Sequence, residues 1–399
     1  MIPVTKIAVI GQGYVGLPIA ILAASAGFDV IGLDNDLERV QKLNSGSSEI
    51  EGVSDADLMS LLKLNKYLAS SDYGLLADVE IILICVPTPL GKGGLPDLAI
   101  LHQTVREIAK NISAGTLVIL ESSVAPGTTR KLVFETILHE STLSYQDFRI
   151  AYSPERIDPT NKRWSLRNTP KVVAGLTEES KTEALAFYSE FVDTLVPCDS
   201  LEVAETAKLL ENSFRLVNIS LVNELAVFCD ALKISVNDVI NAAATKPFGY
   251  MPFSPGLGAG GHCIPIDPLY LADKGRQVGA PFSLIELASK INKDVPSNLV
   301  NKVEIVLNGL SGKRILILGV AYKANVSDTR ESPVKTLIGE LRRKGAKVHW
   351  HDDLVKSWIG EVSTAISEDY DLAILATPHD GLELKKLKSV PILNTQSSN

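Results

Sequence analysis

The sequence predicts an α/β protein with two doubly wound domains joined by a long central helix. Three observations lead to this fold class. Short runs of Ile, Leu and Val alternate with helical patterns over the first 120 residues, the same alternation restarts near Lys313, and one helical pattern spans residues 201–231. Strands that are apolar along their whole length are buried on both faces, which is typical of a parallel sheet covered by helices.

The individual elements follow from these apolar runs. In the first half we expect strands over residues 6–10, 29–34, 80–86 and 117–120, and a helix over 14–26. In the second half we expect strands over 314–318, 347–351 and 371–376, a helix over 333–344, and a Gly/Pro-rich loop over 246–268. The predicted segments are a nucleotide-binding domain over 1–200, a central helical domain over 201–300 and a smaller doubly wound domain over 301–399.

Composition excludes several classes of function. With 45% hydrophobic and 22% charged residues the chain is an ordinary globular protein. Its net charge of -8 argues against a nucleic-acid partner, which needs a basic surface. No apolar run reaches the roughly 18 residues of a membrane span, and no secretion signal is visible. The four cysteines show no metal-like pairing, so we expect a reduced, cytoplasmic protein without a metal.

A glycine triplet indicates the cofactor. Gly11, Gly13 and Gly16 lie between the first strand and the first helix, and Asp34 ends the second strand. This is the Rossmann arrangement, in which glycines allow a tight turn, close approach of the backbone to a pyrophosphate, and close helix packing. The acid would accept hydrogen bonds from ribose hydroxyls and repel a 2′-phosphate, which favours NAD over NADP. Arg39 would either cover the adenine or be an ordinary surface residue.

Cys263 is the candidate nucleophile. It lies in a Gly-Gly-His-Cys-Ile-Pro-Ile-Asp segment at residues 260–267, where glycines allow backbone groups to approach a ligand. Taken alone, this cysteine is as consistent with a structural role as with a reactive one, and we interpret His262 as structural. Cys85 and Cys229 lie in apolar patterns that indicate core positions, and Cys198 lies in a polar loop. A reactive thiol would capture an aldehyde as a thiohemiacetal, whose oxidation gives a thioester that water hydrolyses.

The chain resembles the UDP-glucose/GDP-mannose dehydrogenase family over essentially its whole length. The resemblance lies in motifs that occur in the right order, namely the glycine triplet, VPTP at 86–89, ESSVAPG at 121–127, YSPER at 152–156, KLLEN at 208–212, the cysteine segment, GVAYK at 319–323 and DTR at 328–330. It implies an NAD-dependent, four-electron oxidation of a UDP-sugar at C6. It also implies a homodimer or larger assembly, because the long helix forms a dimer contact in that family.

The resemblance implies a role for each matching residue. Cys263 would be the nucleophile, and Lys208 and Asn212, one helical turn apart, would donate to the oxyanion. Asp267 and Ser123 would position or activate the water, and Glu155 would assist hydrolysis. The implied cofactor contacts are Gly11, Gly13, Tyr14, Val15, Gly16, Asp34, Arg39, Pro87, Thr88, Ser123 and Arg330. The implied substrate contacts are Glu155, Arg156, Lys208, Asn212, Phe253, Gly260, Tyr322 and Lys323.

Departures from the motifs of the UDP-glucose enzymes indicate which branch of the family the chain resembles. The acid that UDP-glucose enzymes carry four residues after the position of Glu155 is here Pro159, with Asp158 one residue away. This segment and residues 242–250 resemble the UDP-N-acetylhexosamine branch, in particular the UDP-N-acetylglucosamine 6-dehydrogenases of polysaccharide synthesis. An Asp-x-Arg-like ending is missing from residues 392–396. UDP-glucose and UDP-N-acetylmannosamine stay open as substrates. A two-electron hydroxyacid dehydrogenase would not need Cys263, and a non-catalytic sensor would be expected to have lost it, Lys208 or Asp267.

Overall fold

The computed structural model describes residues 5–50, 52–157, 161 and 163–396. It divides into two compact units, Met1–Leu210 and Glu211–Asn399, and each is described by itself. The boundary falls within α7 (Leu201–Leu232), the long helix that the sequence predicted. The division into three segments stays a prediction.

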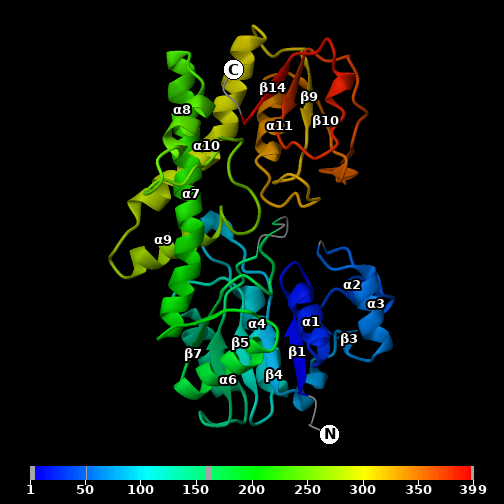
Figure 1. Ribbon diagram of the computed structural model, residues 1–399, viewed down its shortest axis with the longest axis vertical. Helices are drawn as coiled ribbons and strands as arrows, with labels where there is room; N and C mark the ends of the chain where they lie inside the picture. Colours follow the sequence, from blue (N-terminus) through cyan, green and yellow to red (C-terminus); the bar gives the residue numbers. More distant parts are fainter. Residues whose placement is uncertain (1–4, 51, 158–160, 162, 397–399) are drawn as a thin grey trace. The chain divides into compact units, whose positions relative to one another are not determined.

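The first unit is built on an eight-stranded sheet with the strand order β3-β2-β1-β4-β5-β6-β7-β8 (Figure 1). Its first six positions have the Rossmann order, and all of their pairings are parallel. The pairing of β7 with β6 is antiparallel, and β8 is parallel to β7. The strands are β1 (Lys6–Ile10), β2 (Asp29–Leu33), β3 (Tyr67–Ser70), β4 (Ile81–Ile84), β5 (Leu117–Leu120), β6 (Arg149–Tyr152), β7 (Lys171–Gly175) and β8 (Leu195–Pro197).

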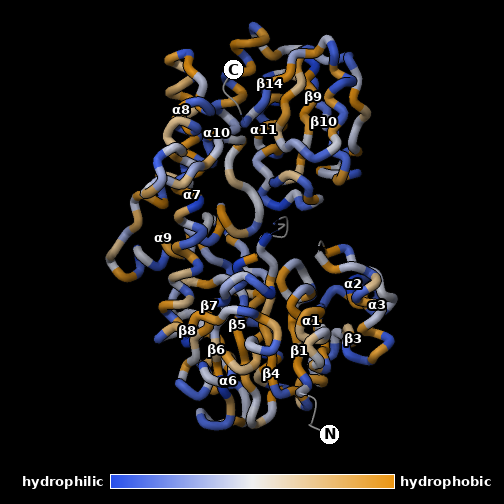
Figure 2. The backbone as a smooth tube through the Cα atoms, in the orientation of Figure 1, coloured by the Kyte–Doolittle hydropathy of each residue, from blue (hydrophilic) through white to orange (hydrophobic). Residues whose placement is uncertain are grey.

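Helices cover both faces of this sheet, which is why its central strands β1, β4 and β5 are apolar over almost their whole length. Ile7 and Val9 of β1 pack with residues of α1, α3 and α6 on one face. Ala8 and Ile10 pack with residues of α4 and α5 on the other. Figure 2 shows the hydrophobic residues concentrated along these strands. The helices are α1 (Gly16–Ser25), α2 (Leu37–Asn44), α3 (Asp55–Lys63), α4 (Ala99–Asn111), α5 (Glu135–Glu140) and α6 (Glu178–Ser189).

The second unit contains a smaller parallel sheet with the order β10-β9-β13-β14. Ile315 and Ile317 of β9 pack with residues of α10 and α11 on one face, and Leu316 and Leu318 lie in a separate core on the other. The strands are β9 (Arg314–Leu318), β10 (Lys347–His351), β13 (Leu372–Leu375) and β14 (Ile392–Asn394), with a hairpin of β11 (Ser357–Trp358) and β12 (Glu361–Val362). The helices after α7 are α8 (Val236–Ala244), α9 (Asp267–Gln277), α10 (Ser283–Val306) and α11 (Val334–Arg343).

The structure confirms the predicted fold class of two Rossmann-like units joined by a long central helix. The expected loop over 246–268 is wrong at its end, since α9 already begins at Asp267. Pro268 lies in the first turn of α9, where a missing N–H costs nothing and a fixed φ favours the helix. Residues 392–394 form a strand despite the missing motif, because β14 pairs in parallel with β13. Within the described part of the chain, no helix is both long and apolar enough to cross a bilayer.

Candidate functional site

In the first unit, the predicted site residues follow the carboxyl ends of neighbouring strands. Gly11 follows β1, Asp34 follows β2, and Pro87 comes three residues after β4. Ser123 and Glu155 each come three residues after the ends of β5 and β6. Ligands of open parallel sheets bind at this edge, where the strand order reverses. The fold therefore gathers sequence segments that are up to 144 residues apart along one edge of one sheet.

The glycine turn has the geometry that a dinucleotide needs. Gly11 has φ +91°, and a Cβ there would lie 2.7 Å from the carbonyl oxygen of Cys85. A Cβ on Gly16 would lie 1.8 Å from the carbonyl oxygen of Gly11. Among the described residues, and apart from its own chain neighbours, nothing lies within 4 Å of the place where a Cβ of Gly13 would be, so the backbone there is open to a pyrophosphate. Tyr14 and Val15 complete the turn into α1 and are half-buried.

Asp34 holds the glycine turn in place. Its Oδ2 accepts the backbone N–H of Gln12 at 2.8 Å, and its Oδ1 accepts that of Asp36 at 3.0 Å. Arg39 lies in the first turn of α2, and its Nη1 contacts Asp34 Oδ2 at 3.1 Å. The structure thus pairs the two residues that the sequence placed at the adenosine end. It also adds Gln12, a buried residue whose amide bonds the carbonyl of Val9 and the hydroxyl of Tyr67.

This pairing sharpens the expectation for cofactor choice. We expect the protein to have a higher kcat/KM with NAD than with NADP. In Asp34→Ala, the ratio of the NAD value to the NADP value should fall by about tenfold or more. The change removes a negative charge that would repel the 2′-phosphate and leaves the Arg39 guanidinium to bind it. Steady-state kinetics with both cofactors measures the ratio. Adding Arg39→Gln to Asp34→Ala should lower kcat/KM with NADP again. Equal kcat/KM values with NAD and NADP in the unmodified protein would contradict the role of Asp34.

Hydrogen bonds tie the segments after β4 and β5 together. Thr88 Oγ1 donates to the carbonyl of Ser123 at 2.8 Å, and Ser122 Oγ donates to the carbonyl of Val86 at 2.7 Å. These bonds join the two segments, so Ser123 lies against Thr88. The structure therefore brings the three predicted cofactor residues of these segments together.

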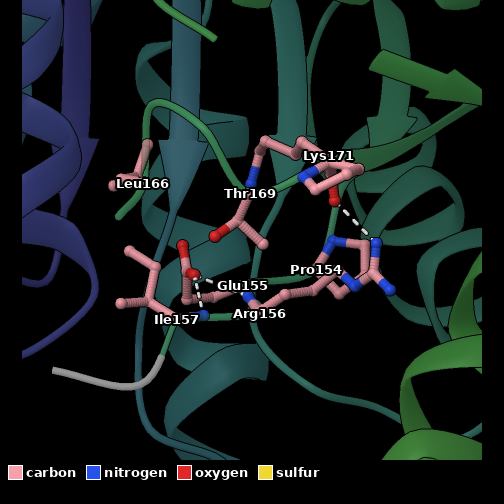
Figure 3. Close-up of a pocket in the computed structure, with 8 residues that line it drawn as sticks. Pro154, Glu155, Arg156, Ile157, Leu166, Thr169 and Lys171 are labelled. Carbon is pink, nitrogen blue, oxygen red and sulfur yellow. Dashed lines mark hydrogen bonds between the residues drawn. The ribbon is translucent and has the colours of Figure 1, made fainter. Parts of the chain in front are cut away.

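A small pocket lies beside Glu155 (Figure 3). The Glu155 carboxylate accepts the backbone N–H groups of Arg156 and Ile157, so it is turned back onto its own turn. The Arg156 guanidinium donates to the carbonyl of Pro170 at 2.6 Å. The predicted departure at Asp158 and Pro159 lies outside the described residues. The pocket is lined by Pro154, Glu155, Arg156, Ile157, Leu166, Thr169, Pro170 and Lys171.

A buried ion pair of Lys171, which lines this pocket, was not predicted from the sequence. Lys171 Nζ lies 2.7 Å from Glu121 Oε2, and the hydroxyl of Tyr188 donates to the same carboxylate. Burial raises the pKa of the Glu121 carboxyl, which the Lys171 charge opposes. Burial also raises the pKa of the nearby Cys85 thiol, so this cysteine is not activated. No local sequence pattern marks this pair, because the two residues lie 50 positions apart.

In the second unit, Asn212 and Asp267 are in direct contact. Asn212 Nδ2 donates to Asp267 Oδ2 at 2.6 Å, and both residues are buried. The backbone N–H of Asp267 donates to the carbonyl of Cys263 at 2.8 Å, so the chain turns between the cysteine and α9. The structure therefore brings Cys263, Asp267 and Asn212 together, with the cysteine exposed. Lys208, one turn before Asn212 on α7, is buried and belongs to the end of the first unit.

His262 does not supply a cation for the thiol. Burial lowers the pKa of His262, and the positive charge of Arg330 lowers it further. The imidazole is therefore neutral near pH 7 and cannot stabilise a thiolate as imidazolium would. This agrees with the interpretation of His262 as a structural residue.

The glycines before the cysteine fit against the second sheet domain. A Cβ on Gly260 would lie 2.7 Å from the carbonyl oxygen of Glu331, and one on Gly261 would lie 2.8 Å from the ring of Tyr322. Tyr322 and Lys323 themselves follow the carboxyl end of β9. The predicted substrate residue Gly260 therefore has a packing reason to be glycine, whatever else it contacts.

Two further predicted residues have partners in the second unit. The Arg330 guanidinium forks onto the Asp328 carboxylate through Nε and Nη2, at 3.0 and 2.6 Å. The ring of Phe253 meets that of Phe214 edge to face, with 5.9 Å between centroids. Neither contact tests the roles that the sequence suggested.

In the second sheet a carboxylate holds the turn after β9, as Asp34 holds the glycine turn of the first sheet. Asp352 follows the end of β10, and its Oδ2 accepts the N–H of Val320 at 2.7 Å in the turn after β9. The same oxygen accepts His379 Nε2 at 3.0 Å. Burial raises the pKa of Asp352, but hydrogen bonds from His379, Val320 and Val355 outweigh it and lower the pKa to about 2. An acid directly after a strand was the sequence signal for this residue.

Comparison with known proteins identifies the class. Three domains of the UDP-glucose/GDP-mannose dehydrogenase family match this chain, the NAD binding domain at residues 5–192, the central domain at 202–294 and the UDP binding domain at 316–395. With its glycine turn and its second parallel sheet, the chain is an NAD-binding dehydrogenase with a UDP binding domain. It belongs to the UDP-glucose/GDP-mannose dehydrogenase family and is an NAD-dependent UDP-sugar dehydrogenase.

Relatives cover almost the entire chain. The UDP-N-acetyl-D-mannosamine dehydrogenase of Pyrococcus horikoshii is 34% identical over 94% of this chain and 89% of its own. The UDP-N-acetyl-D-glucosamine 6-dehydrogenase of Pseudomonas aeruginosa is 33% identical over 94% and 90%. The solved structure of a UDP-D-ManNAc dehydrogenase from Pyrococcus horikoshii superimposes with a TM-score of 0.90 at 33% identity, covering 98% of this chain and 95% of that one.

Proposed function

We propose that this protein oxidises the C6 hydroxyl of a UDP-N-acetylhexosamine to the carboxylate, with UDP-N-acetylglucosamine as the first candidate. Cys263 is the nucleophile of this proposal. The observation that carries it is the contact between Asn212 and Asp267 beside the exposed Cys263. This arrangement offers a thiol, an amide donor and a carboxylate, which are the groups that thioester formation and hydrolysis need.

The chemistry balances over two oxidations. The alcohol loses a proton and a hydride to give an aldehyde, and the Cys263 thiolate adds to its carbonyl carbon to form a thiohemiacetal. Loss of a proton and a second hydride gives a thioester, and water cleaves the C–S bond to release the carboxylate and the thiolate. NAD, when bound, supplies the acceptor for each hydride. One sugar therefore consumes water and yields two NADH.

The protein groups have separate tasks in this proposal. Asn212 uses one amide N–H on Asp267, so its orientation is fixed and its second N–H can donate to the oxyanion. Asp267 lies in the first turn of α9, where the helix dipole stabilises its carboxylate as an acceptor for water. The Lys208 ammonium would share the oxyanion with Asn212. Glu155 and Ser123 belong to the first unit, and the part in hydrolysis that the resemblance implies for them stays a prediction.

The UDP group would bind at the edge of the second sheet. Lys323 supplies a cation at the carboxyl end of β9, and Tyr322 presents a ring beside the cysteine loop. The cofactor contact that the resemblance implies for Arg330 stays a prediction, and its fork onto Asp328 holds the guanidinium in one orientation. The names of the relatives support an N-acetylhexosamine rather than glucose, and they include both the manno and the gluco epimer.

A panel of UDP-sugars tests the proposal. We expect UDP-N-acetylglucosamine to have the highest kcat/KM and to give the uronate, as judged by product mass. UDP-glucose should be about ten- to a hundredfold poorer, because a hydroxyl in the acetamido site would leave polar groups unpaired at roughly 1–3 kcal/mol each. UDP-N-acetylmannosamine and UDP-N-acetylgalactosamine complete the panel and decide the epimer. A UDP-glucose value equal to or above the best hexosamine would overturn the substrate assignment.

An exposed apolar stripe on α7 supports a dimer. Phe214, Leu221, Phe228 and Leu232 are 46%, 61%, 58% and 54% exposed. Their spacing of seven, seven and four residues places them on one face of the helix. Monomeric proteins rarely leave such a row uncovered, so we propose a homodimer or larger assembly through this face.

Disrupting the stripe should change the mass in solution. We expect Leu221→Glu to convert the assembly to monomers at micromolar concentration, because a charge would be buried at the centre of the contact. Light scattering measures the mass. Met59→Glu places the same charge on an exposed apolar position of α3 and should leave the assembly intact. A monomeric unmodified protein would contradict the proposal.

A further inference from the structure

Two buried asparagines hold the backbone of the loop that leads to Cys263. Asn292 of α10 binds Ala259 at two points, since its Oδ1 accepts the N–H at 2.6 Å and its Nδ2 donates to the carbonyl at 3.0 Å. Asn223 of α7 accepts the N–H of Gly256 at 2.9 Å. The two side chains are 8% and 6% exposed, so water does not compete for these bonds. The loop is therefore fixed to two helices before it reaches the cysteine.

The fit of the loop against Asn292 leaves no spare room. Gly258 has φ +110°, and a Cβ there would lie 3.1 Å from the backbone carbonyl oxygen of Asn292 and 3.2 Å from its Oδ1. Closer to the cysteine, Gly261 donates its N–H to the carbonyl of Arg330 at 3.0 Å. After the cysteine, the carbonyl of Cys263 accepts the N–H of Asp267. Asn292 thus makes a two-point side-chain contact with the stretch that ends at the thiol.

We propose that Asn292 is a positioning residue for Cys263, an inference that rests on the proposed function. Its two-point contact with Ala259 fixes the backbone four residues before the sulfur. The first oxidation does not involve the sulfur, whereas the capture of the aldehyde does. Loosening the loop therefore affects the second oxidation more than the first, and more than substrate binding. A misplacement of about 1 Å at a reacting atom lowers a rate by roughly a hundredfold.

The chain offers a matched control for this contact. Asn44 of α2 binds Ala69 of β3 in the same way, with its Nδ2 2.9 Å from the carbonyl and its Oδ1 3.0 Å from the N–H. Asn44→Ala removes the same pair of bonds from the edge of the first sheet. A change seen in Asn292→Ala but not in Asn44→Ala therefore belongs to the cysteine loop.

The test compares these variants in the full-length protein. Amide hydrogen exchange should become at least about tenfold faster for peptides covering residues 256–263 in Asn292→Ala only. With UDP-N-acetylglucosamine or the best substrate of the panel, kcat for the uronate should fall about ten- to a hundredfold, with KM within about threefold. An alkoxyamine trap should then collect the sugar aldehyde, and NADH per uronate should rise above two.

Each outcome decides the proposal. If Asn292→Ala keeps two NADH per uronate, traps no aldehyde and exchanges normally, Asn292 does not position the cysteine. An equal loss of activity in both variants would also overturn the proposal. Should Asn292→Ala fail to fold, Asn292→Asp keeps the acceptor for the Ala259 N–H, replaces the donor with an oxygen that repels the Ala259 carbonyl, and is read out in the same way. If the unmodified protein oxidises no UDP-sugar, the proposed function fails. Hydrogen exchange, which needs no activity, still shows whether Asn292 fixes the loop.

Discussion

Cys263→Ala is expected to abolish uronate formation, with a loss in kcat of more than about a thousandfold. Without the sulfur no thiohemiacetal can form, so the second oxidation has no covalent path. NAD binding should be unchanged, because the glycine turn and Asp34 belong to the first unit and bond to one another. Product mass and NADH per sugar measure the effect, and cofactor titration measures the binding.

Two other variants make this result specific. Cys198→Ala removes a half-buried thiol that follows β8 and should leave activity near that of the unmodified protein. Cys263→Ser should accumulate a covalent or aldehyde intermediate, since an alcohol oxygen adds and leaves at different rates from sulfur. If Cys263→Ala still gives two NADH per sugar at a near-normal rate, the thiol mechanism is wrong. A two-electron dehydrogenase would then be the better description.

The sequence predicted the buried strands best. The strands over 6–10, 117–120, 314–318 and 347–351 have the predicted ends. In the first three, a continuous apolar run is ended by a glycine or a charged residue. The antiparallel strand β7 was not predicted. It begins with Lys171, whose charge is neutralised by Glu121 fifty residues earlier. A pairing between residues so far apart leaves no local pattern, so a buried lysine cannot be distinguished from an exposed one in the sequence.

The candidate site was predicted residue by residue but not contact by contact. The motif order named Asn212 and Asp267, and the structure adds that one donates directly to the other. The pattern at Asp34 suggested ribose, and the structure adds that its carboxylate also holds the glycine turn. Asn292 was not predicted, because its partner Ala259 is bonded through the backbone and any residue could stand there. Side-chain bonds to a distant backbone become visible only when the chain is folded.

Asp267→Asn is expected to stop the reaction at the thioester. The change keeps the size of the side chain, which accepts the Asn212 amide, and removes the negative charge that would accept a proton from water in the proposed mechanism. Each subunit should release about two NADH in a first rapid phase, after which turnover falls about a hundred- to a thousandfold. Rapid-mixing absorbance measures the burst, and the intact mass of acid-quenched protein detects the sugar bound to Cys263.

The contact with Asn212 adds a second expectation to this prediction. Because the two side chains orient each other, the losses in Asn212→Ala and Asp267→Ala should not add in the double variant. Asp273→Asn removes a carboxylate from the next turns of the same helix, where it pairs with Arg276, and should leave the burst and the turnover unchanged. A slow Asp267→Asn variant that shows no burst and no acylated Cys263 would place the carboxylate in the oxidation steps and not in hydrolysis.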